Sequence, residues 1–201
     1  MRAPKVVSRQ LSNPTGFGGR LVRRAMNRGN AGMNEEAVDR LEAAAGDRVL
    51  DIGFGGGVTF QLLFKRGIGV AGVDRSPDVI SAAEADFSEA IGAGKLELSL
   101  GSADSIPFAD DSFEGIVTVN TVYFWPDLDA GMREIHRALK PGGRVVVSIR
   151  DGSVMTRVDP SIFTIRPPAE LVAAMEGAGL VDVRSDATAD GARHHVVARK
   201  P

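Results

Sequence analysis

The stretch Val49-Leu50-Asp51-Ile52-Gly53-Phe54-Gly55-Gly56-Gly57 carries the most information about this chain. Together with Arg48, its first four residues form a short, mostly apolar run, which is typical of a buried strand. Glycines then fall at positions 53, 55 and 57, and a helical pattern follows over residues 58–64. A strand, a glycine turn and a helix in this order predict the opening of a doubly wound α/β fold.

The glycines of this turn suit a bound ligand. A residue without a Cβ lets the backbone turn sharply and come close to a ligand, and the N–H groups that begin the next helix are free to bind it. The dinucleotide fingerprint G-x-G-x-x-G would place its last glycine at position 58, which is Val58. This disfavours a nicotinamide enzyme, and a tight turn without any ligand is the simpler alternative.

What remains over residues 51–57 is Asp-x-Gly-x-Gly-x-Gly. This pattern resembles the first motif of the class I S-adenosylmethionine-dependent methyltransferases. The resemblance implies that Asp51, Gly53, Gly55 and Gly57 bind S-adenosylmethionine as the cofactor.

Asp74 ends a second apolar run, over residues 69–74, and lies 23 positions after Asp51. An acid about 20 residues further on, at the end of the second strand, can accept hydrogen bonds from ribose hydroxyls. The alternative is an acid at a helix N-terminus, because Ser76-Pro77-Asp78 begins a helix. We expect Asp74 and its neighbour Arg75 to bind the cofactor.

Two later segments complete the predicted cofactor site. Residues 101–108 resemble the family's adenine-binding loop, in which an acid accepts from the exocyclic amine, and Asp104, preceded by Ala103, matches that acid. Residues 116–119 are apolar except for Thr118, which is typical of a strand buried on both faces. Asn120 ends this strand at the edge where open parallel sheets bind ligands.

The acceptor is expected at the same strand end. Tyr123, Phe124 and Trp125 follow Asn120, and they include the only Tyr and the only Trp of the chain. Core packing is the alternative role for such a cluster. No His, Asp or Glu lies between Asn120 and Trp125, so the sequence assigns no general base and no catalytic residue.

The resemblance covers roughly residues 30–200 and is also carried by Lys140-Pro141-Gly142-Gly143, which links a helix to a strand over residues 144–149. It implies a Rossmann-like α/β fold with helices on both faces and a short N-terminal helical lid. The seven-stranded sheet should have the order 3-2-1-4-5-7-6 with the last strand antiparallel. The expected division is a basic N-terminal arm and lid, residues 1–34, and a single methyltransferase domain, residues 35–201.

The lid prediction concerns the segment around Asn34. The glycines and asparagine of residues 29–32 predict a break, and Asn34 is a plausible N-cap for a helix over residues 35–45. The resemblance implies that residues 30–34 close over the cofactor.

Length and composition also narrow the class of protein. With 201 residues, no Cys and a formal net charge of −2, the chain is typical of a single cytoplasmic domain. No apolar run reaches the ~20 residues of a membrane span. His194 and His195 are adjacent, so in a strand they point to opposite faces, and we expect no metal site. Residues 1–34 hold seven basic residues and no acid.

The closest resemblance is to the small-molecule branch that includes ubiquinone/menaquinone-type methyltransferases. We therefore expect a small, largely apolar acceptor, with O-methylation of a carboxylate or a phenol/quinol favoured. Asn120-Thr121-Val122-Tyr123 lacks both prolines of the amino-methylating motif, which disfavours DNA-base and glutamine acceptors. The alternative is a nucleic-acid-binding or RNA-methylating protein that uses the basic arm. The sequence does not set the oligomeric state.

Overall fold

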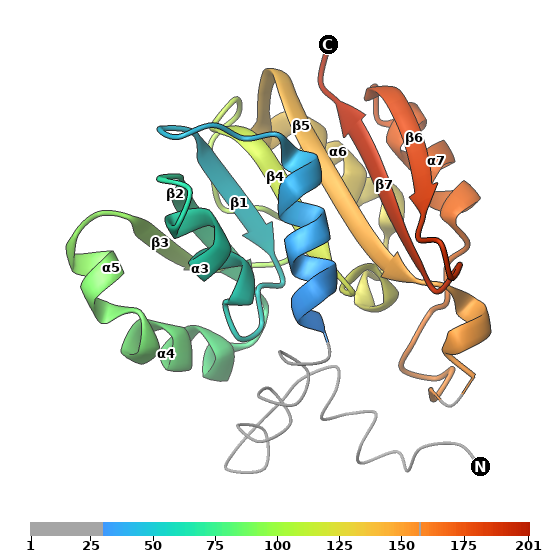
Figure 1. The fold of residues 1–201 in the computed structure, drawn as a ribbon, viewed down its shortest axis with the longest axis horizontal. Helices are drawn as coiled ribbons and strands as arrows, with labels where there is room; N and C mark the ends of the chain where they lie inside the picture. Colours follow the sequence, from blue (N-terminus) through green and yellow to red (C-terminus); the bar gives the residue numbers. More distant parts are fainter. Residues whose placement is uncertain (1–29, 157) are drawn as a thin grey trace.

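The computed structural model describes residues 30–156 and 158–201, so most of the predicted basic arm lies outside the described residues. These residues contain a seven-stranded sheet with the order β3-β2-β1-β4-β5-β7-β6 (Figure 1). The first five strands pair in parallel, and β7 is antiparallel to both β5 and β6. The predicted fold class, strand order and antiparallel last strand are confirmed.

The strands are β1 Arg48–Ile52, β2 Gly69–Asp74, β3 Leu96–Leu100, β4 Phe113–Val119, β5 Leu139–Arg150, β6 Val181–Ala187 and β7 Arg193–Arg199. An N-terminal helix spans residues 30–41 of the described chain. The other helices are α3 Val58–Phe64, α4 Pro77–Asp86, α5 Ser88–Gly92, α6 Leu128–Ala138 and α7 Pro168–Gly177, with 3-10 turns η1 Val122–Phe124 and η2 Gly152–Val154.

Helices cover both faces of the sheet, as predicted. One core contains Met132 of α6 and Leu171 of α7, packed with alternate strand residues. The opposite core contains Val38 of the N-terminal helix and Phe60 of α3. Figure 1 shows the N-terminal helix and α3 in front of the sheet, with α6 behind it.

The central strand β5 shows how the sequence separates these cores. Val145 and Val147 belong to the core under α6 and α7, whereas Val146 belongs to the core under the N-terminal helix. All three side chains are fully buried. Alternate strand residues point to opposite faces, so a continuous valine run is what a strand covered on both faces requires.

The N-terminal helix corrects the sequence prediction. Residues 30–41 are helical, so the break predicted at residues 30–32 and the N-cap at Asn34 are wrong, and the helix stops short of residue 45. Asn34 lies one turn inside the helix, where its Nδ2 donates to the carbonyl of Asn30 across 2.9 Å. Its Oδ1 accepts from the Thr59 hydroxyl across 3.1 Å. A buried tertiary partner thus outweighs the local preference of Asn for a cap.

The same helix is joined to the far part of the sheet. Nδ1 of His195 in β7 lies 2.7 Å from Oγ of Ser148 in β5, and its Nε2 lies 2.9 Å from Oε2 of Glu36. Arg193 of β7 pairs with the other oxygen of Glu36 at 3.1 Å. His194 points the other way, to Asp151, as the alternation of a strand predicts. The division of the chain at residue 34 stays a prediction.

Two smaller differences lie nearer the site. The helix predicted to begin at residues 76–78 is α4, and a second short helix, α5, follows it after Phe87. The Phe87 ring packs edge-on against Phe60, with 5.5 Å between the ring centroids. Helix α6 ends at Ala138, and residues 140–143, which were predicted to link the helix to a strand over residues 144–149, already belong to the long strand β5.

Candidate active site

A cavity of about 400 Å³ opens at the carboxyl ends of β1, β2 and β4. Parallel strands place these ends at one edge of the sheet, which is where open α/β sheets bind ligands. The predicted site residues that line the cavity are Asp51, Gly53, Gly55, Asp74, Arg75, Ala103, Asp104, Asn120, Phe124 and Trp125. Gly57 and Tyr123 are not part of this lining.

Asp51 carries an unusual buried carboxylate. Its side chain is on the cavity wall, the residue is only 2% exposed, and Oδ2 has no hydrogen-bond partner. Burial raises the pKa of Asp51 to about 7, the charge of Asp74 adds to the rise, and the nearby Thr59 hydroxyl opposes it. An unpaired buried carboxylate oxygen is costly, so this atom is suited to accept a hydrogen bond or a positive charge from a ligand.

Asp74 joins the second strand to the glycine turn. Its Oδ1 accepts from the backbone N–H of Ser76 at 3.0 Å, and its Oδ2 accepts from that of Gly55 at 3.4 Å. Burial raises the pKa of Asp74, while these two amides favour the ionised form and limit the rise. The carboxylate is therefore held at the cavity wall in a fixed orientation.

The three alternate glycines have different surroundings, although all have positive φ. A Cβ on Gly53 would lie 2.6 Å from Cγ2 of Thr121, and one on Gly57 would lie 2.7 Å from the Phe87 ring. A Cβ on Gly55 would meet no protein atom within 4 Å. Gly53 and Gly57 are therefore required by protein packing, whereas Gly55 leaves space that belongs to the cavity.

The predicted adenine-binding loop borders the cavity through Ser102, Ala103 and Asp104. The Ser102 hydroxyl donates to Oδ1 of Asp104 across 2.5 Å, which fixes the carboxylate within the loop. The backbone N–H of Gly101 donates to the carbonyl of Asp74 at 3.1 Å, so the loop begins beside the end of β2.

Asn120 adopts the left-handed conformation, with a φ of 59°. Such a conformation is uncommon in a non-glycine residue and is frequent at functional sites. Its Nδ2 donates to Sδ of Met33 at 3.4 Å, and its Oδ1 lies 3.3 Å from the Tyr123 hydroxyl. Asn120 thus connects the end of β4 to the N-terminal helix at the cavity.

Tyr123 is turned into the core by the 3-10 turn η1. It is 2% exposed, its ring lies 6.2 Å from that of Phe163, and its hydroxyl accepts from the backbone N–H of Arg150 at 2.6 Å. Burial raises the pKa of Tyr123 to about 12, so it is protonated at neutral pH. The structure does not bring Tyr123 to the cavity, contrary to its expected contact with the acceptor.

Phe124 and Trp125 do reach the cavity wall. The Arg75 guanidinium carbon lies 5.7 Å from the centre of the Phe124 ring, within cation–π range. The ring of Phe163 supports Phe124 from behind, at 4.7 Å between centroids. This part of the wall combines aromatic surface with a positive charge.

Sequence reasoning missed the polar wall residues Thr59 and Thr121. Asn30 and Asn34 also reach the cavity, from the N-terminal helix, and they lie within residues 30–34, the segment expected to close over the cofactor. The two threonines adjoin predicted motifs, which is the signal that could have found them. The side chain of Asn30 is held by the Arg150 guanidinium at 2.9 Å, a contact across 120 positions that no local pattern reveals.

Within the described ranges, 30–156 and 158–201, the structure contains neither a metal-binding cluster nor a helix suited to span a membrane. Those residues contain no group of three or more His, Asp or Glu side chains placed to hold a metal ion. No helix among them is long and apolar enough to cross a bilayer.

Comparisons with known proteins identify relatives of this chain among the methyltransferases. Residues 50–147 match the family model described as a methyltransferase domain. The O-methyltransferase resE of Aspergillus sclerotiorum is 31% identical over 117 residues, 58% of this chain and 44% of resE. The ubiquinone/menaquinone biosynthesis C-methyltransferase UbiE of Geotalea daltonii is 31% identical over 114 residues, 55% of this chain and 48% of UbiE. The chain spans less than half the length of these relatives.

A solved structure shows that the fold is shared well beyond the matched domain. The S-adenosylmethionine-dependent methyltransferase of Aquifex aeolicus has a TM-score of 0.74 at 18% identity, with 100% of both chains covered. Residues 50–147 therefore form a methyltransferase domain, and the structural likeness extends the shared Rossmann-like fold to the rest of the described chain. The match confirms the predicted resemblance to the S-adenosylmethionine-dependent methyltransferases.

Proposed function

We propose that this protein transfers a methyl group from S-adenosylmethionine to an oxygen of a small, largely apolar acceptor. A carboxylate, a phenol or a quinol would supply that oxygen. The observation that supports this most is the composition of one cavity. The cofactor motifs line one part of it, and Phe124 and Trp125 line another.

The residues present fit the cofactor. Gly55 leaves open space where a side chain would stand, and Oδ2 of Asp51 is buried without a partner. In the proposed arrangement, Asp74 accepts hydrogen bonds from the ribose hydroxyls, and Asp104 accepts one from the adenine amine. When bound, S-adenosylmethionine supplies an electrophilic methyl group on a positively charged sulfur.

The protein's own contribution is positioning and the exclusion of water. None of the residues that line the cavity is His, and its acids already have places in the proposed cofactor site. An acceptor that arrives with an ionised oxygen needs no proton removed by this chain. Arg75, stacked over Phe124, places a positive charge beside the proposed acceptor position.

A screen with a radiolabelled methyl donor tests the proposal. Small carboxylic acids, phenols and quinols form one arm, and RNA and protein form the other. We expect transfer only in the small-molecule arm, and mass spectrometry of the product separates O-methylation from C-methylation. Methylation of RNA without any small-molecule product would support the alternative based on the basic arm.

The acceptor position is tested with matched phenylalanines. Phe124→Ala should lower kcat/KM for the acceptor about tenfold while the cofactor affinity changes little. Phe64→Ala provides the control, because Phe64 packs against Phe87 outside the cavity. Equal losses in the two variants would remove Phe124 from the acceptor site.

A further inference from the structure

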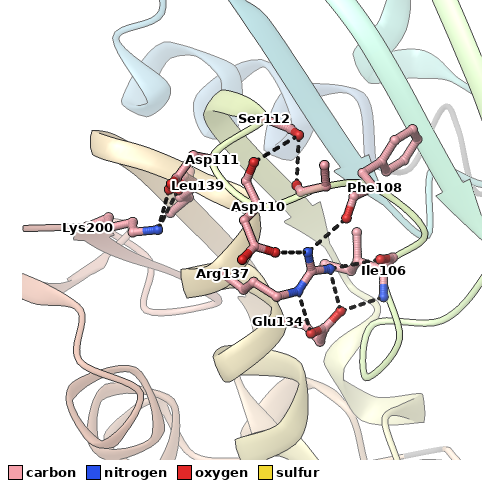
Figure 2. A network of polar contacts seen from close by, with 10 residues as sticks. Ile106, Phe108, Asp110, Asp111, Ser112, Glu134, Arg137, Leu139 and Lys200 are labelled. Atoms are coloured by element: carbon pink, nitrogen blue, oxygen red, sulfur yellow. Dashed lines mark hydrogen bonds and ion pairs between the residues drawn. The ribbon is translucent and has the colours of Figure 1, made fainter.

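The loop from Gly101 to Ser112 is fastened to helix α6 by one arginine. Figure 2 shows the Arg137 guanidinium reaching from α6 to the loop. Its NH2 donates to the carbonyl of Ile106 at 2.9 Å, and its NH1 donates to the carbonyl of Phe108 at 2.8 Å. NH1 also pairs with Asp110 at 2.7 Å. Arg137 therefore binds the loop at every second residue from 106 to 110.

Glu134 completes this connection from the preceding turn of α6. Its Oε1 accepts from Nε of Arg137 and its Oε2 from NH2, both at 2.8 Å. Oε2 also accepts from the backbone N–H of Ile106 at 2.8 Å. Both main-chain groups of Ile106 are thus bound by one arginine–glutamate pair (Figure 2).

The geometry requires a guanidinium. Arg137 uses three nitrogens on one rigid plane to reach two carbonyls and two carboxylates, an arrangement that an ammonium on a flexible chain does not reproduce. The hydrogen bonds that Arg137 donates to Glu134 and Asp110 raise the pKa of Arg137, and the same bond to Glu134 lowers the pKa of that carboxyl group. Lysine would keep the charge and lose the planar set of bonds.

The attachment lies close to the proposed adenine contact. Ile106, bound on both main-chain groups, is two positions after Asp104, and its side chain is buried. The far end of the loop has its own anchors, because Lys200 binds Asp111 at 2.6 Å and the backbone N–H of Ser112 donates to Ala138. Arg137 is therefore not needed to hold that end, and its bonds to Ile106 and Phe108 act on the part beside the cavity.

We propose that Arg137 is a positioning residue for the cofactor's base. It holds the loop so that Asp104 faces the adenine amine, and it thereby sets the selectivity for adenine over bases without that amine. The inference rests on the proposed function, because it assumes that the cavity binds the adenosyl group.

Titration calorimetry of the full chain with two product analogues tests this role. S-adenosylhomocysteine carries the exocyclic amine, and S-inosylhomocysteine carries a carbonyl oxygen that a carboxylate repels. Wild type should prefer the adenosyl compound by a factor of about 100. In Arg137→Lys, we expect about tenfold weaker binding of the adenosyl compound and little change for the inosyl compound, so the preference falls.

Arg144→Lys is the matched control. Arg144 also binds a backbone carbonyl, that of Arg40 at 3.1 Å, and a glutamate, Glu42, and it lies toward the opposite end of β5 from the cavity. This variant should lose melting temperature and keep the wild-type preference between the two analogues. A purely structural role for Arg137 would give the same result as Arg144.

Three outcomes are distinguishable. A reduced base preference in Arg137→Lys alone supports the positioning role. An unchanged preference in a folded variant, with wild type binding S-adenosylhomocysteine normally, overturns this inference and leaves the proposed function intact. If wild type binds neither analogue, the proposed function itself has failed.

Discussion

The backbone N–H of Gly55 donates to Oδ2 of Asp74 across 3.4 Å, so the turn after β1 and the end of β2 are joined at the cavity wall. The second oxygen of the carboxylate accepts from Ser76. One acid therefore orders two chain segments and still faces the cavity. Its removal should affect binding through both its own contact and the turn that it holds.

Asp74→Asn should weaken S-adenosylmethionine binding by about 1.5–3 kcal/mol, which is the range for a hydrogen bond to a charged group. Calorimetry measures this loss directly. Asp78→Asn, at an exposed acid in the first turn of α4, is the control and should bind as wild type does. Unchanged affinity in a folded Asp74→Asn variant would remove Asp74 from the cofactor site.

Gly55 and Gly57 should separate the effect of the turn on binding from its effect on stability. Gly55→Ala places a methyl group in open cavity space at a φ of 54°, so it should reduce cofactor affinity strongly at a stability cost of about 1–2 kcal/mol. Gly57→Ala drives a methyl group into the Phe87 ring and should cost about 1–3 kcal/mol more. Thermal unfolding and calorimetry on both variants check the pattern, which would be contradicted by normal binding in Gly55→Ala.

Asp51 should make the stability of the ligand-free protein fall as pH rises. Its pKa in the fold is about 7, above the ~3.9 of an unfolded chain. The folded state therefore holds more protons between about pH 4 and pH 7, and linkage makes stability decrease through this window as pH rises. Asp51→Asn should remove this part of the slope, as urea unfolding at several pH values would show.

Cofactor binding should lower the pKa of Asp51, whereas folding without a ligand raises it. A positively charged ligand beside Asp51 favours the carboxylate, so its affinity should rise as pH increases through about 7. Calorimetry in buffers of different ionisation enthalpy should then detect proton release near neutral pH. A pH-independent affinity in wild type, matching that of Asp51→Asn, would show that the ligand does not interact with this carboxylate.

Tyr123→Phe should act on stability more than on binding. The change removes the hydroxyl that accepts from the partly buried backbone N–H of Arg150 at 2.6 Å, at a cost of about 1–3 kcal/mol. The melting temperature should therefore fall by several degrees, while the acceptor KM changes less than in Phe124→Ala. A larger effect on the acceptor KM than on melting temperature would restore Tyr123 to the acceptor site.

Much of the fold could be predicted because its signals are local. The apolar runs that end at Ile52 and Asp74 and the glycine turn are sufficient for strand, turn and helix, and family resemblance gave the strand order. The N-terminal helix was predicted less well. Residues 30–32 are helical despite their local turn preference, and the contact of Asn34 with Thr59, 25 positions later, supports that conformation.

The candidate site could likewise be predicted where its signals are local, but not where they depend on contacts distant in the sequence. Positions of cavity residues such as Asp51 and Asp104 followed from motifs that sit at strand ends. The position of Tyr123 did not follow from a motif, because the turn η1 directs its side chain into the core, whereas Phe124, the next residue, reaches the cavity. Arg137 was missed because its partners lie about thirty positions earlier, and its own helix predicts only an exposed arginine.

The N-terminal helix gives the cavity and the β6–β7 hairpin a common element. Asn30 and Asn34 face the cavity from this helix, and Glu36 holds His195 and Arg193 of β7. A ligand that restrains the helix should therefore also make local opening of the hairpin less favourable, and opening of the hairpin should weaken ligand binding by the same free energy. The two regions are thermodynamically reciprocal, although β7 contributes no residue to the cavity wall.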